Sequence, residues 1–246
     1  MLLRPLFIFA TSVAYDINAI KNPRTDISDL FPELNEKKLG REIEVKIKLN
    51  KNQRDGLRKW LHETKEVTSK GKVEQQDIYF DNPEKTFLFD RVDKYGKKIK
   101  DFLRSVRIRF SNKKKSVNTK LRYVDSNWET LSRDEFEKEM TREEAGKLYK
   151  KWKEERGYTE TFEVKKVREV YSFGDLEIAF DTIKSLDDAT FVEIEVNKKG
   201  VDVQTGMTMI YGFLKKRGIT EFVQYDHSYL HMVIDPGHNF GYKKAL

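Results

Sequence analysis

The chain contains no cysteine, so it has no disulfide, no thiolate metal ligand and no cysteine nucleophile. No apolar run approaches the ~20 residues that a membrane-spanning helix needs, so we expect no membrane partner. The phosphate-binding motifs GxxxxGKS/T and GxGxxG are also missing, which argues against P-loop enzymes and dinucleotide-binding proteins. With these classes set aside, we expect a cytoplasmic protein.

Charged residues make up 36% of the 246-residue chain, and hydrophobic residues only 38%. The charged fraction exceeds the ~25% that is usual for globular domains, whereas 12% aromatic residues argue against disorder. The net charge of +7 and a pI near 9.2 favour a polyanionic partner, such as a nucleotide, polyphosphate, nucleic acid or anionic lipid. Composition does not choose among these partners.

Strand patterns recur along the chain from residue 41 onward and are separated by short turns. Alternation predicts strands at 41–49, 74–80, 105–110, 116–124, 134–140, 160–171, 176–183 and 191–197. Helical spacing and capping signals predict helices at 53–65, 141–157 and 201–217. About eight strands without βαβ alternation predict an α+β fold with an antiparallel sheet. We interpret residues 90–102 and 111–116 as solvated turns, and the aromatic stretch after residue 219 as irregular.

Residues 1–39 precede this pattern and form an unassigned N-terminal extension. Their apolar start loosely resembles a secretory signal, but it is short and Pro5 interrupts it, so we prefer the extension. Residues 40–235 are predicted to form one domain, because no linker divides them, and residues 236–246 form a C-terminal tail.

The predicted strands carry charged residues on one face and apolar residues on the other. In "GREIEVKIKLN", Ile43 and Val45 share one face, and Glu44 and Lys46 share the opposite face. A single strand of this kind is typical of a half-exposed sheet with its charged face in water. Six such strands favour a second interpretation, in which the sheet closes, helices cover the apolar faces, and the charges line an enclosed space.

The two signs of charge fall on different strands of this predicted sheet. Arginine and lysine dominate at 105–110 and 116–124, and glutamate dominates at 191–197. Enclosed charges need partners, because an unpaired buried charge costs several kcal/mol. Clustered guanidinium and ammonium groups suit phosphate oxygens, and clustered carboxylates suit Mg²⁺ or Mn²⁺. The pattern therefore predicts a metal–polyphosphate site inside a barrel, without specifying the reaction.

The motifs on these charged strands resemble those of a known family. "EIEVK" matches the ExExK signature of the CYTH, or triphosphate tunnel metalloenzyme, superfamily. The resemblance continues through "QQDIYFD", "VRIR", "TKLR", "KKVREVY", "LEIAFDTI" and "FVEIEV", over roughly residues 41–235. Within the superfamily, the chain looks most like class IV adenylyl cyclases, their CyaB-like relatives and thiamine triphosphatases. The resemblance implies an eight-stranded antiparallel closed β-barrel, the triphosphate tunnel, with helices packed outside.

The resemblance also implies roles for individual residues. The metal ligands, for Mg²⁺ or Mn²⁺, would be Glu42, Glu44, Asp181, Glu193 and Glu195. The phosphate-binding residues would be Lys46, Arg107, Arg109, Lys120, Arg122, Lys166 and Arg168. Lys46, Arg168 and Asp181 would be catalytic. Two loops depart from the family pattern: "SLDDAT" replaces a Gly-Leu-Gly turn, and "LRY" replaces a Gly-Pro after Lys120.

The leading functional hypothesis is a class IV-like adenylyl cyclase that converts ATP to cyclic AMP and pyrophosphate. The alternative is a triphosphatase acting on thiamine triphosphate, inorganic triphosphate or a nucleoside triphosphate. A third hypothesis is a non-catalytic binder of nucleotides or RNA 5′-triphosphates. We expect a small triphosphate rather than nucleic acid as the partner, and a homodimer stays open.

The four histidines give a weaker signal. His227 and His231 are four residues apart in a region that could be helical, a spacing that can bind a metal ion. No carboxylate motif such as HExxH accompanies them, so we interpret them as packed or exposed residues.

Overall fold

The structure is a computed structural model, and it describes residues 38–41, 43–81, 88–92, 97–102, 104–112, 115–124 and 130–246. All described residues belong to one compact unit, Lys37–Leu246. The division of the sequence into residues 1–39, 40–235 and 236–246 stays a prediction.

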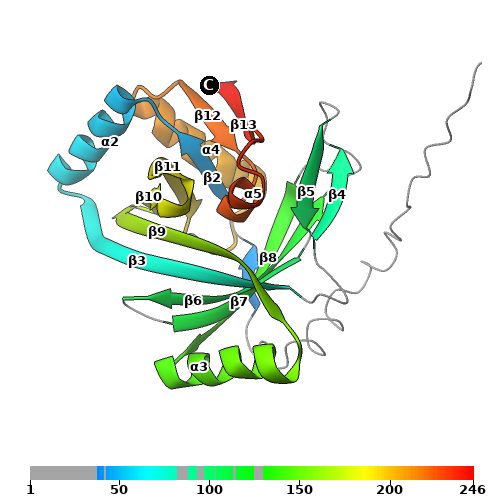
Figure 1. The fold of residues 1–246 in the computed structure, drawn as a ribbon. Helices are drawn as coiled ribbons and strands as arrows, with labels where there is room; N and C mark the ends of the chain where they lie inside the picture. The colour runs from blue at the N-terminus through cyan, green and yellow to red at the C-terminus, as the bar shows by residue number, and fades with distance from the viewer. Residues whose placement is uncertain are drawn as a thin grey trace, which may run out of the picture. The chain divides into compact units, whose positions relative to one another are not determined.

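Strands dominate the described unit (Figure 1). They are β1 (Lys38–Arg41), β2 (Glu44–Lys48), β3 (Val67–Asp81), β4 (Leu88–Val92), β5 (Lys98–Phe102), β6 (Arg104–Ser111), β7 (Lys115–Val124), β8 (Thr130–Met140), β9 (Thr159–Phe173), β10 (Leu176–Ile183), β11 (Ala189–Val196), β12 (Glu221–Tyr225) and β13 (Gly241–Ala245). The helices are α2 (Lys51–Glu63), α3 (Arg142–Lys150), α4 (Val203–Lys216) and α5 (Tyr229–Ile234), with a π-turn η3 (Lys151–Glu155) and a 3₁₀ turn η4 (Lys184–Leu186).

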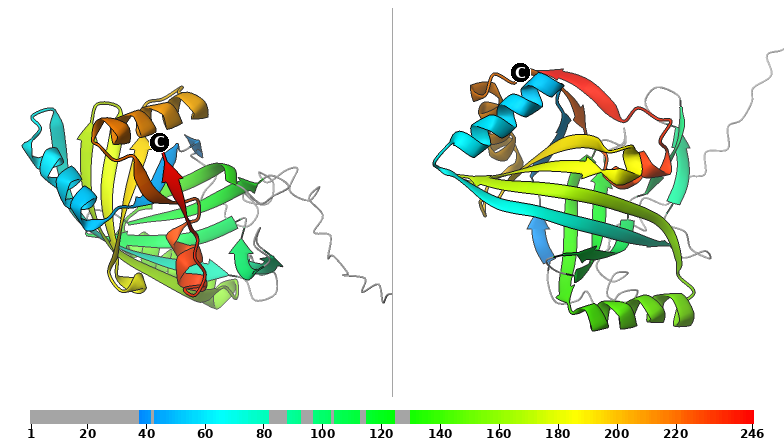
Figure 2. Two further views of the ribbon diagram at one scale, coloured as in Figure 1. Left: turned by 90° about the horizontal axis from the view of Figure 1, so that it is seen from above. Right: turned by 60° about the vertical axis from the view of Figure 1, so that its left-hand side comes forward.

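Eleven of the described strands form one antiparallel sheet in the order β1-β8-β7-β6-β3-β9-β10-β11-β2-β12-β13, and β4 pairs with β5 separately. The two longest strands, β3 and β9, pair along most of their length and join the two halves of the sheet. Figures 1 and 2 show β6, β7 and β8 on one side of this pair and β2, β10 and β11 on the other. The predicted antiparallel α+β fold is confirmed.

The segment 38–48 reaches both halves of this sheet. β1 pairs with β8, whereas β2, two residues later, pairs with β11 and β12. Among the residues that the structure describes, the ladder of hydrogen bonds does not close, because its order begins at β1 and ends at β13. The predicted closed eight-stranded barrel is therefore not confirmed. The physical reason is that β12 already takes up the hydrogen bonds on the edge of β2 opposite β11.

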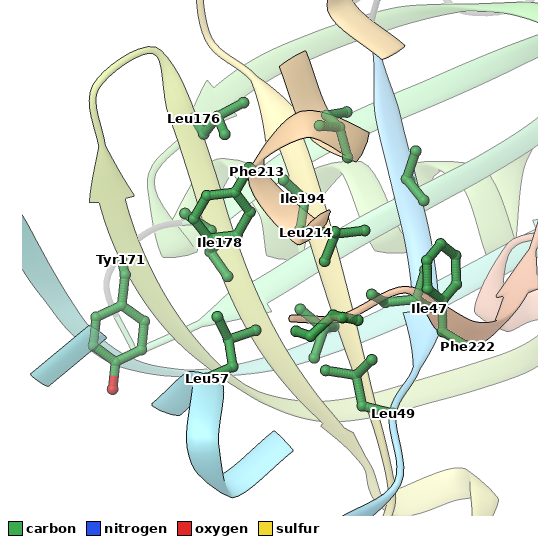
Figure 3. Packing of buried hydrophobic residues seen from close by; sticks show 14 of the residues in the cluster. Ile47, Leu49, Leu57, Tyr171, Leu176, Ile178, Ile194, Phe213, Leu214 and Phe222 are labelled. Carbon is green, nitrogen blue, oxygen red and sulfur yellow. The ribbon is translucent and has the colours of Figure 1, made fainter. Parts of the chain in front are cut away.

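The apolar faces of β2, β10 and β11 are covered by helices. Ile47, Ile178 and Ile194 project from these strands and are 0% exposed, and Leu57 of α2 and Leu214 of α4 pack in the same cluster (Figure 3). Each fully buried side chain of this size contributes about 1.5–3 kcal/mol to folding. This packing fixes which face of each strand is turned away from the helices.

Capping boxes begin two of the helices, and the predicted start at Thr141 is confirmed. The side chains of Asn50 and Thr141 each accept a hydrogen bond from the backbone N–H of the residue three positions later. The side chain of that later residue in turn accepts a hydrogen bond from the backbone N–H of the cap residue. Asn50 starts α2 two residues before the predicted position, because it satisfies the first free N–H groups of the helix. The π-turn η3 directly follows α3, and the helical segment ends near Gly157, which has a φ of +65°.

The turn between β10 and β11 is where the sequence departs from the family pattern. Asp187 and Asp188 occupy it with φ of 51° and 56°. Aspartate tolerates this left-handed conformation better than most residues, although glycine adopts it more readily. The turn therefore keeps a left-handed backbone without glycine.

Parts of two regions expected to be irregular, residues 90–102 and the stretch after residue 219, form regular elements in the structure. Residues 90–102, interpreted from the sequence as solvated turns, contribute to the β4–β5 hairpin, where Ile99 and Phe102 are 3% and 6% exposed. The prediction was wrong because that stretch buries its apolar residues against α5, in a second apolar cluster that also holds Leu230 and Phe191. Figures 1 and 2 both show α5 beside the hairpin.

Candidate functional site

The charged faces of β2, β9, β10 and β11 are turned away from α2 and α4, which cover the apolar faces. Their side chains are buried, since Lys46 and Lys166 are each 5% exposed and Asp181 is 0% exposed. A face exposed to water would leave such residues accessible. For these strands, the sequence interpretation of inward-facing charges therefore describes the structure, and the half-exposed alternative does not.

Five inward-facing residues from four adjacent strands form a connected group, which we name the Asp181 cluster: Lys46, Lys166, Arg168, Asp181 and Glu193. Arg168 donates to Asp181 twice, from Nε to Oδ1 at 2.7 Å and from Nη2 to Oδ2 at 2.6 Å, and it also contacts Glu193. Lys46 Nζ lies 3.1 Å from Glu193 Oε1. The strand register produces these pairs, because Asp181 is opposite Arg168, and Glu193 is opposite Lys46.

Burial and charge act in opposite directions within the Asp181 cluster. Burial raises the pKa of Glu193, but the cations Lys46 and Arg168 outweigh it and hold that pKa well below its usual 4.5. Burial and the neighbouring charge of Arg168 lower the pKa of Lys166 to about 8. At neutral pH the three cations of the cluster therefore face two carboxylates, which leaves an excess of positive charge.

Helix α5 supplies two further contacts to the Asp181 cluster. The hydroxyl of Tyr229 donates to Asp181 Oδ2 at 2.9 Å, and its ring centroid lies 4.3 Å from Lys46 Nζ. Lys46 Nζ also donates to the backbone carbonyl of His227 at 3.2 Å. Burial and the charge of Asp181 raise the pKa of Tyr229 well above 10.0, so the phenol remains protonated and acts as a donor.

A second group of charges lies on β3 and β6, and we name it the Asp77 cluster: Asp77, Arg107 and Arg109. Asp77 accepts from Arg107 Nη1 at 2.9 Å and from Arg109 Nε and Nη2 at 2.6 and 2.8 Å. Burial raises the pKa of Asp77, but the two guanidinium groups outweigh it and hold that pKa well below its usual 3.8. The two arginines thus share this carboxylate, and Arg107 Nη1 also donates to the hydroxyl of Tyr79 at 3.2 Å.

The two clusters belong to one electrostatic environment. The charge of Lys166 contributes to lowering the pKa of Asp77, and the charge of Arg109 contributes to lowering the pKa of Lys166. Lys166 also lines a pocket of about 290 Å³ together with Gln75 and Ser111, its neighbours across β3 and β6. The charges of the two clusters therefore act on one another.

Three glutamates lie side by side on adjacent strands, one row beyond the Asp181 cluster. Glu195 of β11 is opposite both Glu177 of β10 and Glu44 of β2. Glu177 also pairs with Lys70 at 2.7 Å. Directly opposed like charges destabilise a sheet, and a divalent cation with oxygen ligands relieves that repulsion. Carboxylates are ligands that Mg²⁺ and Mn²⁺ accept, but the ligand atoms of these three glutamates do not all lie within 4.8 Å of one another.

Most of the predicted site residues that the structure describes come together. These are Lys46, Lys166, Arg168, Asp181 and Glu193 in one cluster, Arg107 and Arg109 in the other, and Glu44 and Glu195 in the acidic row. Glu42 and the side chains of Lys120 and Arg122 lie outside the described residues. The individual roles of all these residues stay predictions.

Sequence reasoning missed Asp77 and Tyr229. Asp77 shares a face with Gln75 and Tyr79 in "QQDIYFD", so the alternation that singled out the other strands could have found it. Tyr229 lies in the aromatic tail, which we interpreted as irregular. Nothing in the local pattern there indicates that α5 packs against β9, because that contact joins residues distant in sequence.

Comparison with known protein families assigns most of the chain to one domain. A family model described as the CYTH domain matches residues 40–204, which is well over half of the chain. The chain belongs to the CYTH family. CYTH proteins are typically metal-dependent enzymes that act on triphosphate substrates, in agreement with an interior that combines basic clusters and an acidic row.

Solved structures similar to this CYTH chain support its fold. The PH1819 protein of Pyrococcus horikoshii OT3 is 21% identical, with a TM-score of 0.55 over 79% of this chain and 99% of that one. A conserved hypothetical protein of Pyrococcus furiosus, Pfu-838710-001, is 22% identical, with a TM-score of 0.52 over 77% of this chain and 98% of that one. At these identities the likeness concerns the fold alone.

A candidate adenylate cyclase of Vibrio parahaemolyticus is 14% identical and has a TM-score of 0.49, over 72% of this chain and 87% of that one. This likeness is too distant to carry an argument about activity. No curated protein sequence matches the chain. Among the helices that the structure describes, none is both long and apolar enough to cross a membrane.

Proposed function

We propose that this CYTH protein is a metal-dependent enzyme acting on a triphosphate, and that it converts ATP to cyclic AMP and pyrophosphate. The observation that carries the proposal is the gathering of five buried or partly buried cations on the same side of the sheet as the acidic row. Five cations, Lys46, Arg107, Arg109, Lys166 and Arg168, face three carboxylates in the two clusters. Burying a net positive charge is costly unless an anion balances it.

The geometry of the cations suits a chain of phosphates. Guanidinium groups bind phosphate oxygens through two parallel hydrogen bonds, and ammonium groups act as point charges. Arg109 already makes a two-bonded contact of this kind with Asp77, and Arg168 makes one with Asp181. A triphosphate would compete with these carboxylates for the same donors, so its binding replaces existing ion pairs rather than filling vacant sites.

The acidic row would hold the metal ion. Glu44 and Glu195, with Glu193 two residues away on the same face of β11, offer carboxylate oxygens toward the Asp181 cluster. The two oxygens of Asp181 already accept from Arg168, Lys166 and Tyr229, so Asp181 would join the metal shell only by releasing one of these donors. A bound Mg²⁺ or Mn²⁺ would neutralise charge on the phosphate oxygens.

In the proposed reaction, the ribose 3′ oxygen attacks the α-phosphorus, loses its proton, and the bond to pyrophosphate breaks. Arg168 and Lys46 would stabilise the charge that develops on the phosphate oxygens. The same positioning would serve hydrolysis, in which water attacks the terminal phosphorus and loses a proton, the bond to the diphosphate leaving group breaks, and orthophosphate is the product. The resemblance of residues 157–196 to class IV adenylyl cyclases is what favours cyclisation.

Product analysis tests the proposal. The full chain is incubated with Mg²⁺ or Mn²⁺ and with ATP, GTP, thiamine triphosphate or inorganic triphosphate, and the products are resolved by chromatography. Cyclic AMP and pyrophosphate from ATP would confirm the cyclase. Orthophosphate would instead establish a triphosphatase, and binding of triphosphates without turnover would leave a binding protein.

A variant of the acidic row tests the role of the metal. Glu44→Gln removes one charge with little change of shape, so turnover at limiting metal should fall much more than stability. Because Glu44 faces Glu195 across the strand pair, the variant should melt at the same or a higher temperature in the absence of metal. Glu63→Gln, an exposed change in α2, is the matched control and should alter neither property. Full activity of Glu44→Gln at limiting metal would remove Glu44 from the ligand set.

A further inference from the structure

A third group of metal-ligating side chains lies outside the two charge clusters and the acidic row. It joins Asp101 of the β4–β5 hairpin to His227, just before α5, and His231, within α5. The ligand atoms of these three residues all lie within 4.8 Å of one another. Among the described residues, this is the one group of three or more histidines and acids that meets this spacing.

The surroundings of the group fix the orientation of its side chains. Asp101 is 0% exposed and His231 is 1% exposed, and His231 Nε2 lies 2.9 Å from Asp101 Oδ1. The opposite ring nitrogen, His231 Nδ1, is 2.9 Å from Ser228 Oγ. The ring of Phe102 stacks on His231, with centroids 4.0 Å apart, and Phe240 packs on His227. Both apolar rings restrict access of water to the group.

We propose that Asp101, His227 and His231 form a second metal site, distinct from the predicted Mg²⁺ or Mn²⁺ site, that binds a Zn²⁺-like transition-metal ion. Two imidazoles and one carboxylate are ligands that zinc and its neighbours accept, whereas Mg²⁺ prefers oxygen ligands alone. Three protein ligands leave the fourth tetrahedral position to water.

A hydrogen-bonded aspartate–histidine pair could explain two of the three residues, but it does not require the third. A metal ion accounts for why a second imidazole converges on the same point. The contact to Ser228 fits as well, because a metal-bound histidine usually uses its other ring nitrogen for an orienting hydrogen bond. Asp101 also accepts from the backbone N–H of Phe102 at 2.7 Å, which orients the carboxylate.

The proposed ion would tie the hairpin to α5 and thereby to the triphosphate site. His227 offers its backbone carbonyl to Lys46, and Tyr229, between the two histidines, donates to Asp181. Fixing His227 and His231 therefore restrains both contacts. We assign the ion a positioning role, since its ligands touch neither cluster through their own side chains.

Cobalt binding tests the site without relying on activity. The full chain is stripped with a chelator, desalted, and titrated with Co²⁺ in excess Mg²⁺, which occupies the acidic row. We expect one Co²⁺ per chain that survives desalting, the visible absorption bands of a four- or five-coordinate ion, displacement by Zn²⁺, and a melting temperature that rises with Zn²⁺. Glu195→Gln should keep this binding, which separates the site from the predicted magnesium site.

Variants then identify the ligands. His227→Gln and Asp101→Asn should each lower the Co²⁺ affinity by more than about 100-fold, since even changes to residues behind the ligands cost 10–100-fold. Ser228→Ala should lower it by about 10- to 100-fold, because it frees the His231 ring. His62→Gln and Asp90→Asn are matched controls elsewhere on the chain and should bind as the unmodified chain does.

The proposal is overturned if the unmodified chain binds no stoichiometric Co²⁺ or Zn²⁺, or if folded His227→Gln binds as tightly as His62→Gln does. Asp101 and His231 are fully buried, so their variants could unfold. His227, which is half-buried, and Ser228 then decide the outcome, with circular dichroism to confirm that each variant is folded.

Discussion

The Asp77 and Asp181 clusters each bury one more cation than carboxylate, yet they are connected differently. In the Asp77 cluster a single carboxylate holds both arginines. In the Asp181 cluster three cations share two carboxylates, and Tyr229 donates to one of these as well. From this difference we expect that the stability lost when one residue of a buried cluster is replaced depends on the number of alternative partners, and not on the net charge of the cluster.

The connectivity follows from the strands. Asp77 comes from β3 and meets arginines from β6, so only two strands contribute. The Asp181 cluster draws on β2, β9, β10 and β11, whose register brings residues of opposite sign together at Asp181–Arg168 and at Glu193–Lys46. We expect the Asp77 cluster to fail when one residue is removed, and the Asp181 cluster to redistribute its contacts.

The largest effect is expected for Asp77→Asn, which leaves Arg107 and Arg109 without their shared carboxylate. Removing one partner of a buried ion pair costs about 3–5 kcal/mol, so the free energy of unfolding should fall by roughly that amount. Denaturant unfolding measures the loss. Inorganic triphosphate should restore more of the melting temperature in this variant than in the unmodified chain, because it supplies the missing anion.

The pH dependence provides a control for Asp77→Asn. The folded-state pKa of Asp77 is held below its ordinary 3.8, so its stabilisation is present above that pH and is lost as the pH falls toward the folded pKa. The stability difference between the variant and the unmodified chain should therefore shrink below about pH 4. Asp90→Asn, an exposed change on β4, should show no such difference. A constant difference across this range would contradict the assignment.

The second prediction concerns Arg109→Ala, which removes one cation from the Asp77 cluster. Losing one charge-assisted contact costs about 1.5–3 kcal/mol, or roughly 10- to 150-fold in affinity. Calorimetry should show inorganic triphosphate and ATP weakened by similar factors, since the contact involves neither base nor sugar. Arg58→Ala is the control, because Arg58 pairs with Glu169 away from the site. A change of base preference with unaltered inorganic triphosphate binding would show that Arg109 contacts the nucleoside.

The third prediction uses the lowered pKa of Lys166, which is about 8. Above that pH the free protein loses this positive charge, and a bound triphosphate would restore the proton. Affinity should therefore fall by up to about tenfold per pH unit above pH 8, with proton uptake on binding measurable by calorimetry in two buffers. Lys166→Arg stays charged and should lose this dependence.

The same shift has an opposite consequence for stability. Because the folded pKa of Lys166 is below its ordinary 10.5, the unfolded chain binds more protons between pH 8 and pH 10.5. The contribution of Lys166 to the free energy of unfolding should rise with pH across that window. A fall of this contribution, obtained by comparison with Lys166→Arg, would mean that Lys166 gains a stabilising partner rather than losing water.

The smallest effect is expected for Tyr229→Phe, which removes only the hydroxyl that donates to Asp181. Arg168 and Lys166 still contact that carboxylate, so the loss should be about 0.5–1.5 kcal/mol. Thermal unfolding measures it, and Tyr242→Phe at the surface serves as the control. A loss as large as that of Asp77→Asn would contradict the idea that the Asp181 cluster redistributes its contacts.

The strands that form the site could be predicted closely from local pattern. The predicted strand at 176–183 coincides with β10. The alternation there places Asp181 on one face of the strand and Ile178 and Phe180 on the other face. The capping box at Thr141 was also evident, because cap residues act within one turn, whereas the capping box at Asn50 was not predicted. The β4–β5 hairpin and α5 were missed, since their burial depends on each other and on no local period.

Sequence alone determined which residues of each strand share a face, because side-chain alternation is a property of a single extended chain. It also determined the sign of charge on each strand and, through the ordered motifs, the family. Only the tertiary structure decided that Asp77 is the shared partner of Arg107 and Arg109, that Tyr229 reaches Asp181, and that β12 occupies the edge of β2. These outcomes depend on register between distant segments, which the packing of α2, α4 and α5 selects and which no stretch of sequence encodes by itself.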